Sequence, residues 1–253
     1  MNLFDLSGRL ALITGSSKGI GFALAQALAG AGAGIVLNAR DPAALEEARS
    51  RLAKTGAVVH ALAFDVTDPE AVTAGIAKIE AEIGPIDILF NNAGMQHRTP
   101  LQDFPLEAWN RLINTNINSV FLVGQAVGRR MIERGRGKII NVCSVQSEMA
   151  RPGIAPYTAT KGAIKMLTKG MATDWARYGL QVNGLGPGYF KTELNKALVE
   201  DEKFSAWLST RTPAGRWGDV SELGGAAIFL ASDASSFING HILYVDGGIT
   251  ASL

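Results

Sequence analysis

The sequence predicts a single α/β domain over residues 1–253, built on a doubly wound, seven-stranded parallel sheet with helices on both faces. Short apolar runs alternate with stretches of helical character, which is typical of parallel sheets with crossover helices. Aspartate followed by proline opens two helices, at 41–42 and 68–69, since aspartate caps a helix and proline fits its first turn. No linker or low-complexity segment divides the chain.

The expected elements follow one another in order. The first strand, at 9–14, lies between two glycines, and the first helix covers 22–29. The later strands are expected at 35–38, 58–64, 86–90, 138–142, 180–185 and 242–245. The later helices are expected at 41–54, from 68 onward, and at 106–130, 154–178 and 222–231.

The composition excludes several classes of protein. Hydrophobic residues make up 47% of the chain and charged residues 19%, which is enough apolar material for a large core. The net charge is +1 and the basic residues form no cluster, so we expect neither nucleic acid nor a membrane as partner. Cys143 is the only cysteine, the N-terminus lacks the features of a signal peptide, and no metal site is evident, so a cytoplasmic protein without metal is expected.

A glycine-rich turn joins the first strand to the first helix. Glycines here permit a tight turn and let backbone N–H groups approach a pyrophosphate at the helix N-terminus. The spacing G-x-x-x-G-x-G departs from the usual G-x-G-x-x-G pattern, so a packing turn is the competing interpretation. The strand before it and the helix after it favour dinucleotide binding by Gly15, Ser17, Lys18, Gly19, Ile20 and Gly21.

Tyr157 and Lys161 lie four residues apart in a predicted helix, so their side chains share one face. An ammonium group beside a phenol favours the ionised phenol, which makes the hydroxyl a usable proton donor and acceptor. A carbonyl reductase or alcohol dehydrogenase needs such a group beside a hydride carrier. A solvated surface pair is the alternative, and the glycine-rich turn argues against it because it supplies a site for the carrier.

Several motifs occur in the order and spacing of the short-chain dehydrogenase/reductase family, which essentially the whole chain resembles. The resemblance implies a Rossmann fold and hydride transfer between a nicotinamide cofactor and the substrate. The motifs are Thr14-Gly-x-x-x-Gly-Ile-Gly21, Asn91-Asn-Ala-Gly94, Asn116, Ser144, Tyr157-x-x-x-Lys161 and Pro187-Gly188.

The end of the second strand bears on the choice of cofactor. An acidic residue there would bind the ribose 2′-hydroxyl of NAD, but the sequence reads Asn38-Ala39-Arg40. Arg40 can hold a 2′-phosphate, and Lys18 in the glycine turn adds a second cation. We therefore expect NADP(H) to be favoured over NAD(H); two solvent-facing surface charges are the alternative.

The family resemblance implies further cofactor contacts. The residues after the third strand match the position that binds the adenine, although Asp65 could instead cap the following helix. The loop after the fourth strand matches the adenosine-ribose side of the site, although asparagines there could simply stabilise the backbone. The segment from Pro187 matches the loop over the nicotinamide, with an ordinary turn as alternative. The residues concerned are Asp65, Val66, Asn92, Ala93, Gly94, Pro187, Gly188 and Thr192.

The resemblance also implies a mechanism. Tyr157 would act as general acid and base, and Lys161 would assist it and bind the nicotinamide ribose. Ser144 would hold the reacting oxygen. Asn116 matches the asparagine whose helix irregularity binds a water that links the lysine to solvent, with Asn114 as the alternative.

The runs around these motifs resemble the family members that interconvert D-gluconate and its 5-keto form. A sugar acid needs a cation for its carboxylate and polar partners for its hydroxyls. Arg98 is the candidate for the carboxylate or polyol, and Gln146 and Glu148 for hydroxyls, with surface or intersubunit contacts as alternatives. His97 departs from the basic residue expected there, and a substrate lid is expected at about 190–217.

Three interpretations of function remain open at this stage. The first is the sugar-acid oxidoreductase. The second is another reductase of the same frame, acting on a 3-oxoacyl thioester or another sugar. The third is a dinucleotide-binding regulator without turnover. The presence of the complete catalytic set argues against it; the set is Asn116, Ser144, Tyr157 and Lys161. The family resemblance also implies a homotetramer.

Overall fold

The computed structural model describes residues 2–253, and these form one sheet whose paired strands are all parallel. The predicted doubly wound α/β fold is confirmed: the chain moves outward from the central strand, returns, and continues on the other side. In spatial order the seven strands are β3 (Val59–Ala61), β2 (Gly34–Leu37), β1 (Leu10–Ile13), β4 (Ile86–Asn91), β5 (Gly137–Val142), β6 (Leu180–Pro187) and β7 (Ile242–Val245).

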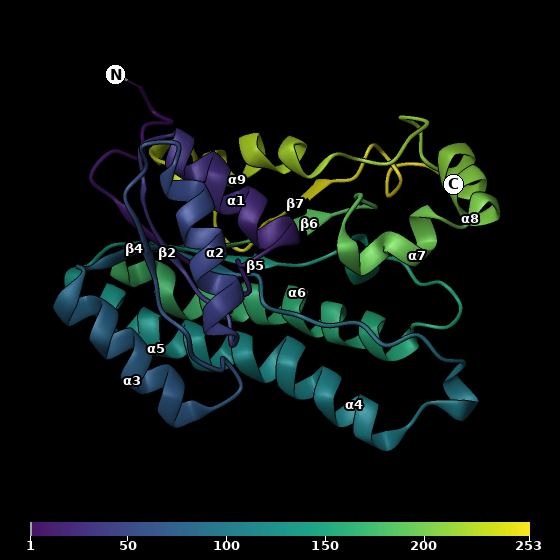
Figure 1. Ribbon diagram of the computed structural model, residues 1–253, viewed down its shortest axis with the longest axis horizontal. Coiled ribbons are helices and arrows are strands. Elements are labelled where there is room, and N and C mark those ends of the chain that lie inside the picture. Colours follow the sequence, from purple (N-terminus) through teal and green to yellow (C-terminus); the bar gives the residue numbers. More distant parts are fainter. Residues whose placement is uncertain (1) are drawn as a thin grey trace.

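Helices cover both faces of the sheet, with α1, α2 and α9 on one face and α3, α5 and α6 on the other (Figure 1). The α-helices are α1 (Gly19–Gly30), α2 (Pro42–Ala53), α3 (Pro69–Glu82), α4 (Leu106–Ile113), α5 (Ser119–Arg134), α6 (Ala155–Trp175), α7 (Lys196–Val199), α8 (Glu202–Arg211) and α9 (Gly224–Ala231). The predicted caps are present, since Asp41 and Asp68 each accept hydrogen bonds from backbone N–H groups of the first turns of α2 and α3.

The core is divided by the sheet because successive strand residues point to opposite faces. Ile13 and Phe90 pack with the helices of the first face, whereas Leu12 and Leu89 pack with those of the second. All four are fully buried. The continuous apolar runs of the sequence therefore serve two cores at once, as strands of a parallel sheet must.

The predicted helix at 106–130 is the clearest departure from expectation. It is α4 and α5 joined by a π-helical turn at Asn114–Asn118, and it continues to Arg134. The third strand is shorter than predicted, and the predicted helix at 222–231 begins with a 3-10 turn capped by Asp219. Periodicity does not detect such changes because a π or 3-10 turn is short and alters the spacing of apolar residues only locally.

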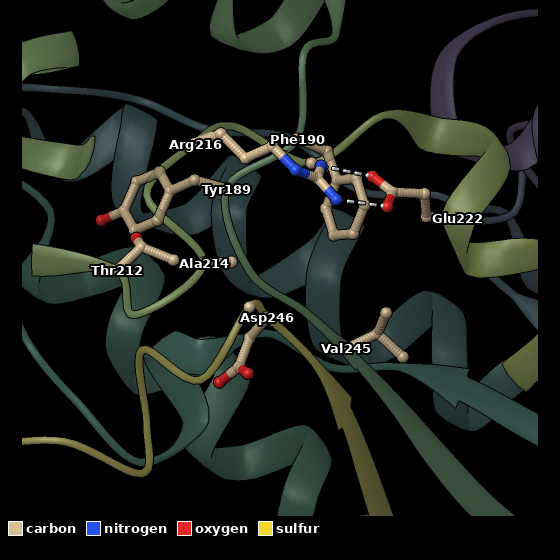
Figure 2. Close-up of a pocket in the computed structure, with 10 residues that line it drawn as sticks. Tyr189, Phe190, Thr212, Ala214, Arg216, Glu222, Val245 and Asp246 are labelled. Atoms are coloured by element: carbon tan, nitrogen blue, oxygen red, sulfur yellow. Dashed lines mark hydrogen bonds and ion pairs between the residues drawn. The ribbon is translucent and has the colours of Figure 1, made fainter.

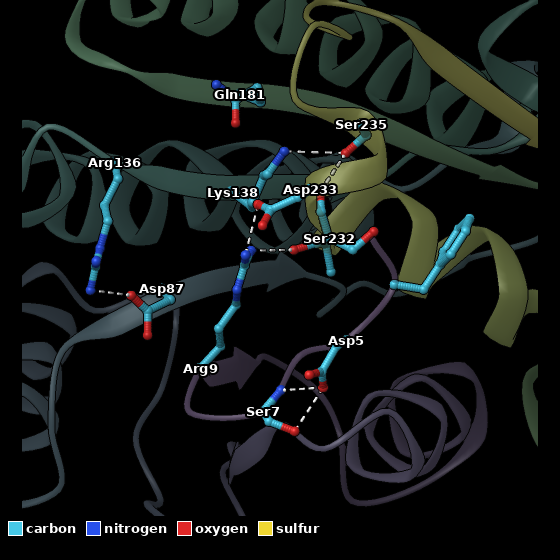
Figure 3. A network of polar contacts seen from close by, with 12 residues as sticks. Asp5, Ser7, Arg9, Asp87, Arg136, Lys138, Gln181, Ser232, Asp233 and Ser235 are labelled. Carbon is cyan, nitrogen blue, oxygen red and sulfur yellow. Dashed lines mark hydrogen bonds and ion pairs between the residues drawn. The ribbon is translucent and has the colours of Figure 1, made fainter. Parts of the chain in front are cut away.

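A polar network lies at the opposite edge of the sheet from the strand carboxyl ends, at the start of β5 (Figure 3). Lys138 is 5% exposed there, and its Nζ donates to Ser235 Oγ at 3.2 Å. Burial lowers the pKa of Lys138 to about 8; the Asp233 carboxylate opposes this change and the Arg9 charge adds to it. Arg9 in turn pairs with Asp233 at 2.7 Å.

The lowered pKa predicts how Lys138 affects stability with pH. Between about pH 8 and pH 10 the unfolded chain keeps a proton that the folded chain has lost, so this group makes the protein more stable as the pH rises. We expect the Lys138→Met variant to be more stable than the wild type at neutral pH, with the difference in unfolding free energy shrinking as the pH rises through that range.

Urea unfolding at several pH values measures this difference. Cys143, whose pKa is raised by burial to about 11, titrates in both proteins and so cancels from the comparison. Lys78→Met removes an exposed lysine on α3 and serves as the control. A difference between Lys138→Met and wild type that stays constant with pH would contradict the prediction.

Candidate active site

A cavity of about 880 Å³ opens at the edge of the sheet where the parallel strands reach their carboxyl ends. Loops that follow β1 to β6 line it, together with the start of α6 and part of the predicted lid. Open α/β sheets bind ligands at this edge, where the strand order reverses. The predicted cofactor residues all line this one cavity, although they come from segments far apart in the sequence.

The glycine turn between β1 and α1 is held by the loop after β4. Asn92 Nδ2 donates to the backbone oxygens of Thr14 and Gly15, each at 2.9 Å. Thr14 Oγ1 accepts from the backbone N–H groups of Asn92 and Ala93, each at 3.0 Å. Gly15 and Gly19 have φ values of +62° and +58°, which glycine adopts without strain. Asn92 thus has a structural role, in agreement with the alternative interpretation, and lines the cavity as well.

Arg40 and Asp65 lie at the end of the cavity formed by the loops after β2 and β3. The guanidinium is 3.8 Å from the carboxylate, and the Arg40 side chain is 79% exposed. Asp65 also accepts hydrogen bonds from the backbone N–H and hydroxyl of Thr67, so its own turn fixes it. It does not cap α3, because Asp68 does. Arg40 is therefore positioned at the cavity with its charge reachable from solvent.

Lys18 bridges the mouth of the cavity to the lid segment. Its Nζ donates to a carboxylate oxygen of Glu193 at 2.8 Å, and both side chains are 73% exposed. Water screens exposed ion pairs, so this contact is weak enough to be exchanged for a ligand phosphate. Lys18 is thus a second cation at the cavity, as the sequence predicts.

Ser144, Tyr157 and Lys161 meet in the same cavity beyond the end of β5. Ser144 Oγ accepts from the backbone N–H of Gln146 at 3.1 Å, which leaves its own hydroxyl proton for another acceptor. The Nζ of Lys161 donates to the backbone oxygen of Val142 at 2.7 Å and lies 5.7 Å from the centre of the Tyr157 ring. Tyr157 and Lys161 stand one turn apart on α6, so the predicted shared face is present.

Asn116 lies behind the cavity and does not line it. It sits in the π-helical turn, 2% exposed, and its side chain exchanges hydrogen bonds with the backbone N–H and oxygen of Met95. Its Nδ2 also donates to Thr160 Oγ1 on α6 at 3.1 Å. The helix irregularity that the resemblance implies is thus present, and Asn116 ties the loop after β4 to the helix that carries Tyr157. Asn114, the alternative residue, lines the cavity itself.

The structure brings Arg98 and Gln146 to the cavity but not Glu148. Glu148 does not line the cavity: its carboxylate accepts hydrogen bonds from Lys165 Nζ and from the Tyr244 hydroxyl, which lower the pKa of Glu148. Its contact with substrate stays a prediction. A 3-10 turn at Val145–Ser147 changes the direction of the chain between Gln146 and Glu148, so the two side chains have different surroundings.

Arg151 and Tyr189 also line this cavity, although the sequence assigned neither of them a role. Gln146 Nε2 donates to the Tyr189 hydroxyl at 3.3 Å, and Arg98 Nη2 donates to Asn195 Oδ1 at 3.2 Å. Arg151 reaches the cavity from the segment before α6. The sequence does show an arginine between Ser144 and Tyr157, in addition to Arg98. It does not show that the Arg151 side chain points into the cavity.

The predicted lid contains two helices that the sequence did not reveal, α7 and α8. Tyr189 and Phe190, just before it, point in different directions beside a small pocket (Figure 2). Tyr189 packs with Phe204 and Trp217, whereas Phe190 covers Gly218. At the other end of the lid Arg216 forms a two-pronged pair with Glu222, at 2.7 and 2.8 Å. Both ends of the lid are therefore anchored beside β6 and β7.

Among residues 2–253 no group of three or more acidic, histidine or cysteine side chains is arranged to hold a metal ion. Within the same part of the chain, none of the helices combines the length and the hydropathy that crossing a membrane demands.

Comparison with known proteins agrees with this geometry. Residues 15–250 match a family model described as enoyl-(acyl carrier protein) reductase. A gluconate 5-dehydrogenase of Gluconobacter oxydans (strain 621H) is 62% identical over 252 residues, covering 100% of this chain and 98% of that protein. The chain belongs to the short-chain dehydrogenase/reductase family. The resemblance drawn from its motifs is therefore confirmed.

Two further family members resemble the chain over its whole length. A 5-keto-D-gluconate 5-reductase of Escherichia coli (strain K12) is 54% identical, covering 100% of this chain and 99% of that protein. The crystal structure of a gluconate 5-dehydrogenase from Burkholderia cenocepacia J2315, in complex with NADP and tartrate, superimposes with a TM-score of 0.98. It is 58% identical and the alignment covers 100% of this chain and 99% of that one.

Proposed function

We propose that this protein is an NADP(H)-dependent oxidoreductase that interconverts D-gluconate and 5-dehydro-D-gluconate. The observation that carries the proposal is the joint presence, in one cavity, of Ser144, Tyr157 and Lys161 with the cation Arg98. Relatives that share 62% and 54% of their residues with the chain over its full length bear the names of these two activities. An anionic polyol suits a cavity that offers both a guanidinium group and several neutral polar groups.

The cavity fits a dinucleotide at its glycine turn. A Cβ atom on Gly15 would stand 2.8 Å from the Cα of Ala93, and one on Gly21 would stand 2.5 Å from the backbone oxygen of Gly15. Only glycine lets the turn and its backbone N–H groups lie this close to the next loop. The cofactor would be held by the glycine turn, by Arg40 and Lys18, and by the loop from Pro187 to Thr192. When bound, the nicotinamide supplies or accepts the hydride at the substrate carbon.

Residues of the protein transfer the proton to and from the substrate oxygen. The Ser144 hydroxyl, whose oxygen is already engaged by the Gln146 N–H, donates to the reacting carbonyl oxygen. Tyr157 gives its proton to that oxygen in reduction and takes it back in oxidation. Lys161 is fixed by the Val142 carbonyl, so that its positive charge stays beside the Tyr157 ring. Asn116 holds α6 against the loop after β4 and thereby positions Tyr157.

The preference for NADP(H) over NAD(H) rests on Arg40. We expect Arg40→Asp to lower kcat/KM for NADPH by roughly 10- to 1000-fold, because a carboxylate repels the 2′-phosphate and a charge-assisted contact is lost. The same change should leave kcat/KM for NADH the same or higher. Arg129→Asp, which makes the same charge change on the exposed part of α5, is the matched control.

Steady-state kinetics of the two variants with both cofactors measure this effect. Equal kcat/KM values for NADH and NADPH in the wild type, unaffected by Arg40→Asp, would contradict the preference.

A panel of substrates with NADPH consumption as readout separates the three functions considered. We expect turnover of 5-keto-D-gluconate. Turnover of acetoacetyl thioesters without turnover of 5-keto-D-gluconate would favour a 3-oxoacyl thioester reductase, and binding of NADPH without any turnover would favour a regulator. The homotetramer, the lid at about 190–217, the single functional domain over residues 1–253 and the cytoplasmic location stay predictions.

A further inference from the structure

Two arginines meet at the substrate end of the cavity. Arg98 comes from the loop after β4 and Arg151 from the segment between β5 and α6, and both line the cavity beside Tyr157 and Tyr189. Their charges act on one another: partial loss of water, and then the Arg151 charge, lower the pKa of Arg98. Like charges placed together cost free energy, so the pairing calls for an explanation.

Arg151 is held by few polar contacts of its own. Its Nη1 donates to the backbone oxygen of Pro152 at 3.3 Å, and its guanidinium carbon lies 5.4 Å from the centre of the Phe204 ring. Its Nε is buried and has no hydrogen-bond partner within residues 2–253. In that part of the chain Arg151 also forms no ion pair. A donor that is buried without a partner costs about 1–3 kcal/mol unless a ligand or water satisfies it.

Three of the other cations that line the cavity have carboxylate partners. Lys18 faces Glu193 at 2.8 Å, Arg40 faces Asp65 at 3.8 Å, and Arg111 faces Glu107 at 3.2 Å. These three charges have carboxylates from the protein, whereas Arg151 has none among the described residues. The positive charge at Arg151 is therefore available to an anion that enters the cavity.

The cations at the two ends of the cavity are placed to bind different anions, the cofactor at one end and the substrate at the other. Lys18 and Arg40 follow β1 and β2, at the end proposed for the cofactor's phosphates, whereas Arg98 and Arg151 follow β4 and β5. Ser144 and Tyr157 lie at this second end, also after β5 and on α6. An anion drawn to the arginine pair would consequently be the substrate rather than the cofactor.

We infer that Arg151 is a specificity-determining residue which, together with Arg98, binds the carboxylate of the sugar acid. A guanidinium group can donate two parallel hydrogen bonds to a carboxylate, and two such groups neutralise it from two sides. The site selects aldonic acids over neutral ketoses and polyols of the same length. This inference rests on the proposed function, because it names the part of the cavity that recognises that substrate.

The lid contributes to the position of Arg151. Phe204, on whose ring the guanidinium lies, belongs to α8, and it packs on Tyr189 and Trp217 with ring centres 5.8 and 6.1 Å away. Burial raises the pKa of Tyr189, and the Arg151 charge and a hydrogen bond from Arg151 oppose this change. Arg151 thus stands in the segment before α6 and contacts Phe204 of the lid.

A pair of substrates that differ only in charge tests the inference. L-Sorbose has the same carbon chain as 5-keto-D-gluconate, with CH2OH in place of the carboxylate. We expect Arg151→Gln to lower the ratio of kcat/KM for 5-keto-D-gluconate to that for L-sorbose by about 10- to 100-fold, mainly through KM. Arg151→Lys keeps the charge and should restore part of the ratio.

Arg129→Gln on α5 serves as the matched control, and circular dichroism establishes that each variant is folded. A ratio that is the same in Arg151→Gln and wild type, or equal losses with both substrates, would overturn the role of Arg151. A wild-type protein without turnover of 5-keto-D-gluconate would overturn the proposed function and this inference with it, so the two failures are distinguishable. Calorimetric binding of D-gluconate to the NADP complex, weakened in Arg151→Gln, gives a readout independent of turnover.

Discussion

Tyr157→Phe is expected to lower kcat by about 10²- to 10⁴-fold, which is the usual contribution of a general acid or base. The phenyl ring keeps its place on α6, but no hydroxyl remains to give the proton to the substrate oxygen. The affinity for NADPH should stay within a factor of about 3, because the glycine turn, Arg40 and Lys18 are untouched. Steady-state kinetics and a titration of NADPH fluorescence measure the two quantities.

Tyr178→Phe is the matched control, since it removes a hydroxyl from an exposed tyrosine whose partner is Arg177. It should alter neither kcat nor cofactor affinity. Turnover in Tyr157→Phe at a rate close to that of the wild type would contradict the proton-transfer scheme, whereas a loss of NADPH binding would mean that the hydroxyl serves cofactor binding rather than proton transfer alone.

Gly21→Ala is expected to weaken NADPH binding by at least about 10-fold and to lower the unfolding free energy by about 1–3 kcal/mol. A Cβ atom at this position would stand 2.4 Å from Asn92 Nδ2 and 2.5 Å from the backbone oxygen of Gly15. Asn92 Nδ2 is the atom that holds the turn through the oxygens of Thr14 and Gly15. The added methyl group therefore displaces the Asn92 side chain from the glycine turn between β1 and α1.

Gly30→Ala supplies the control within the same helix. Nothing lies within 4 Å of a Cβ atom there, so the change should cause no clash. Because alanine favours helices over glycine, Gly30→Ala should raise the unfolding free energy by about 0.5–1 kcal/mol and leave NADPH binding as it is. Urea unfolding and NADPH titration of both variants measure the effects. NADPH binding by Gly21→Ala as tight as that of wild type would refute the role of this contact.

The order of strands and helices could be predicted from the sequence because each signal is local. Runs such as Leu10–Ile13 are apolar throughout, which indicates buried strands. Asp41 and Asp68, each followed by proline, mark the starts of the helices that they cap. The π-helical turn around Asn116 and the helices α7 and α8 were not detected from periodicity. The turn is only five residues long, so it alters the spacing of apolar residues only locally. The helix α8 packs aromatic side chains into a cluster with Tyr189 and Trp217 that sequence spacing does not reveal.

The residues proposed to bind the cofactor could be predicted from the sequence because they lie in contiguous motifs, each just after a strand. The substrate residues were harder to predict, because side-chain direction in an irregular segment depends on tertiary contacts. Glu148 and Arg151 are three residues apart and both are charged, yet their surroundings differ. Glu148 forms hydrogen bonds with Lys165 and Tyr244 outside the cavity, whereas Arg151 lines the cavity and contacts Phe204 of the lid. Neither Lys165 nor Phe204 is near these residues in the sequence.

The position at which hydride arrives tests the central claim most directly. The protein would be incubated with 5-keto-D-gluconate and NADPH carrying deuterium at C4 of the nicotinamide, and the product analysed by NMR. The proposed function predicts D-gluconate with deuterium bound to C5. Formation of the C5 epimer, deuterium at another carbon, or no reaction with this substrate would contradict it.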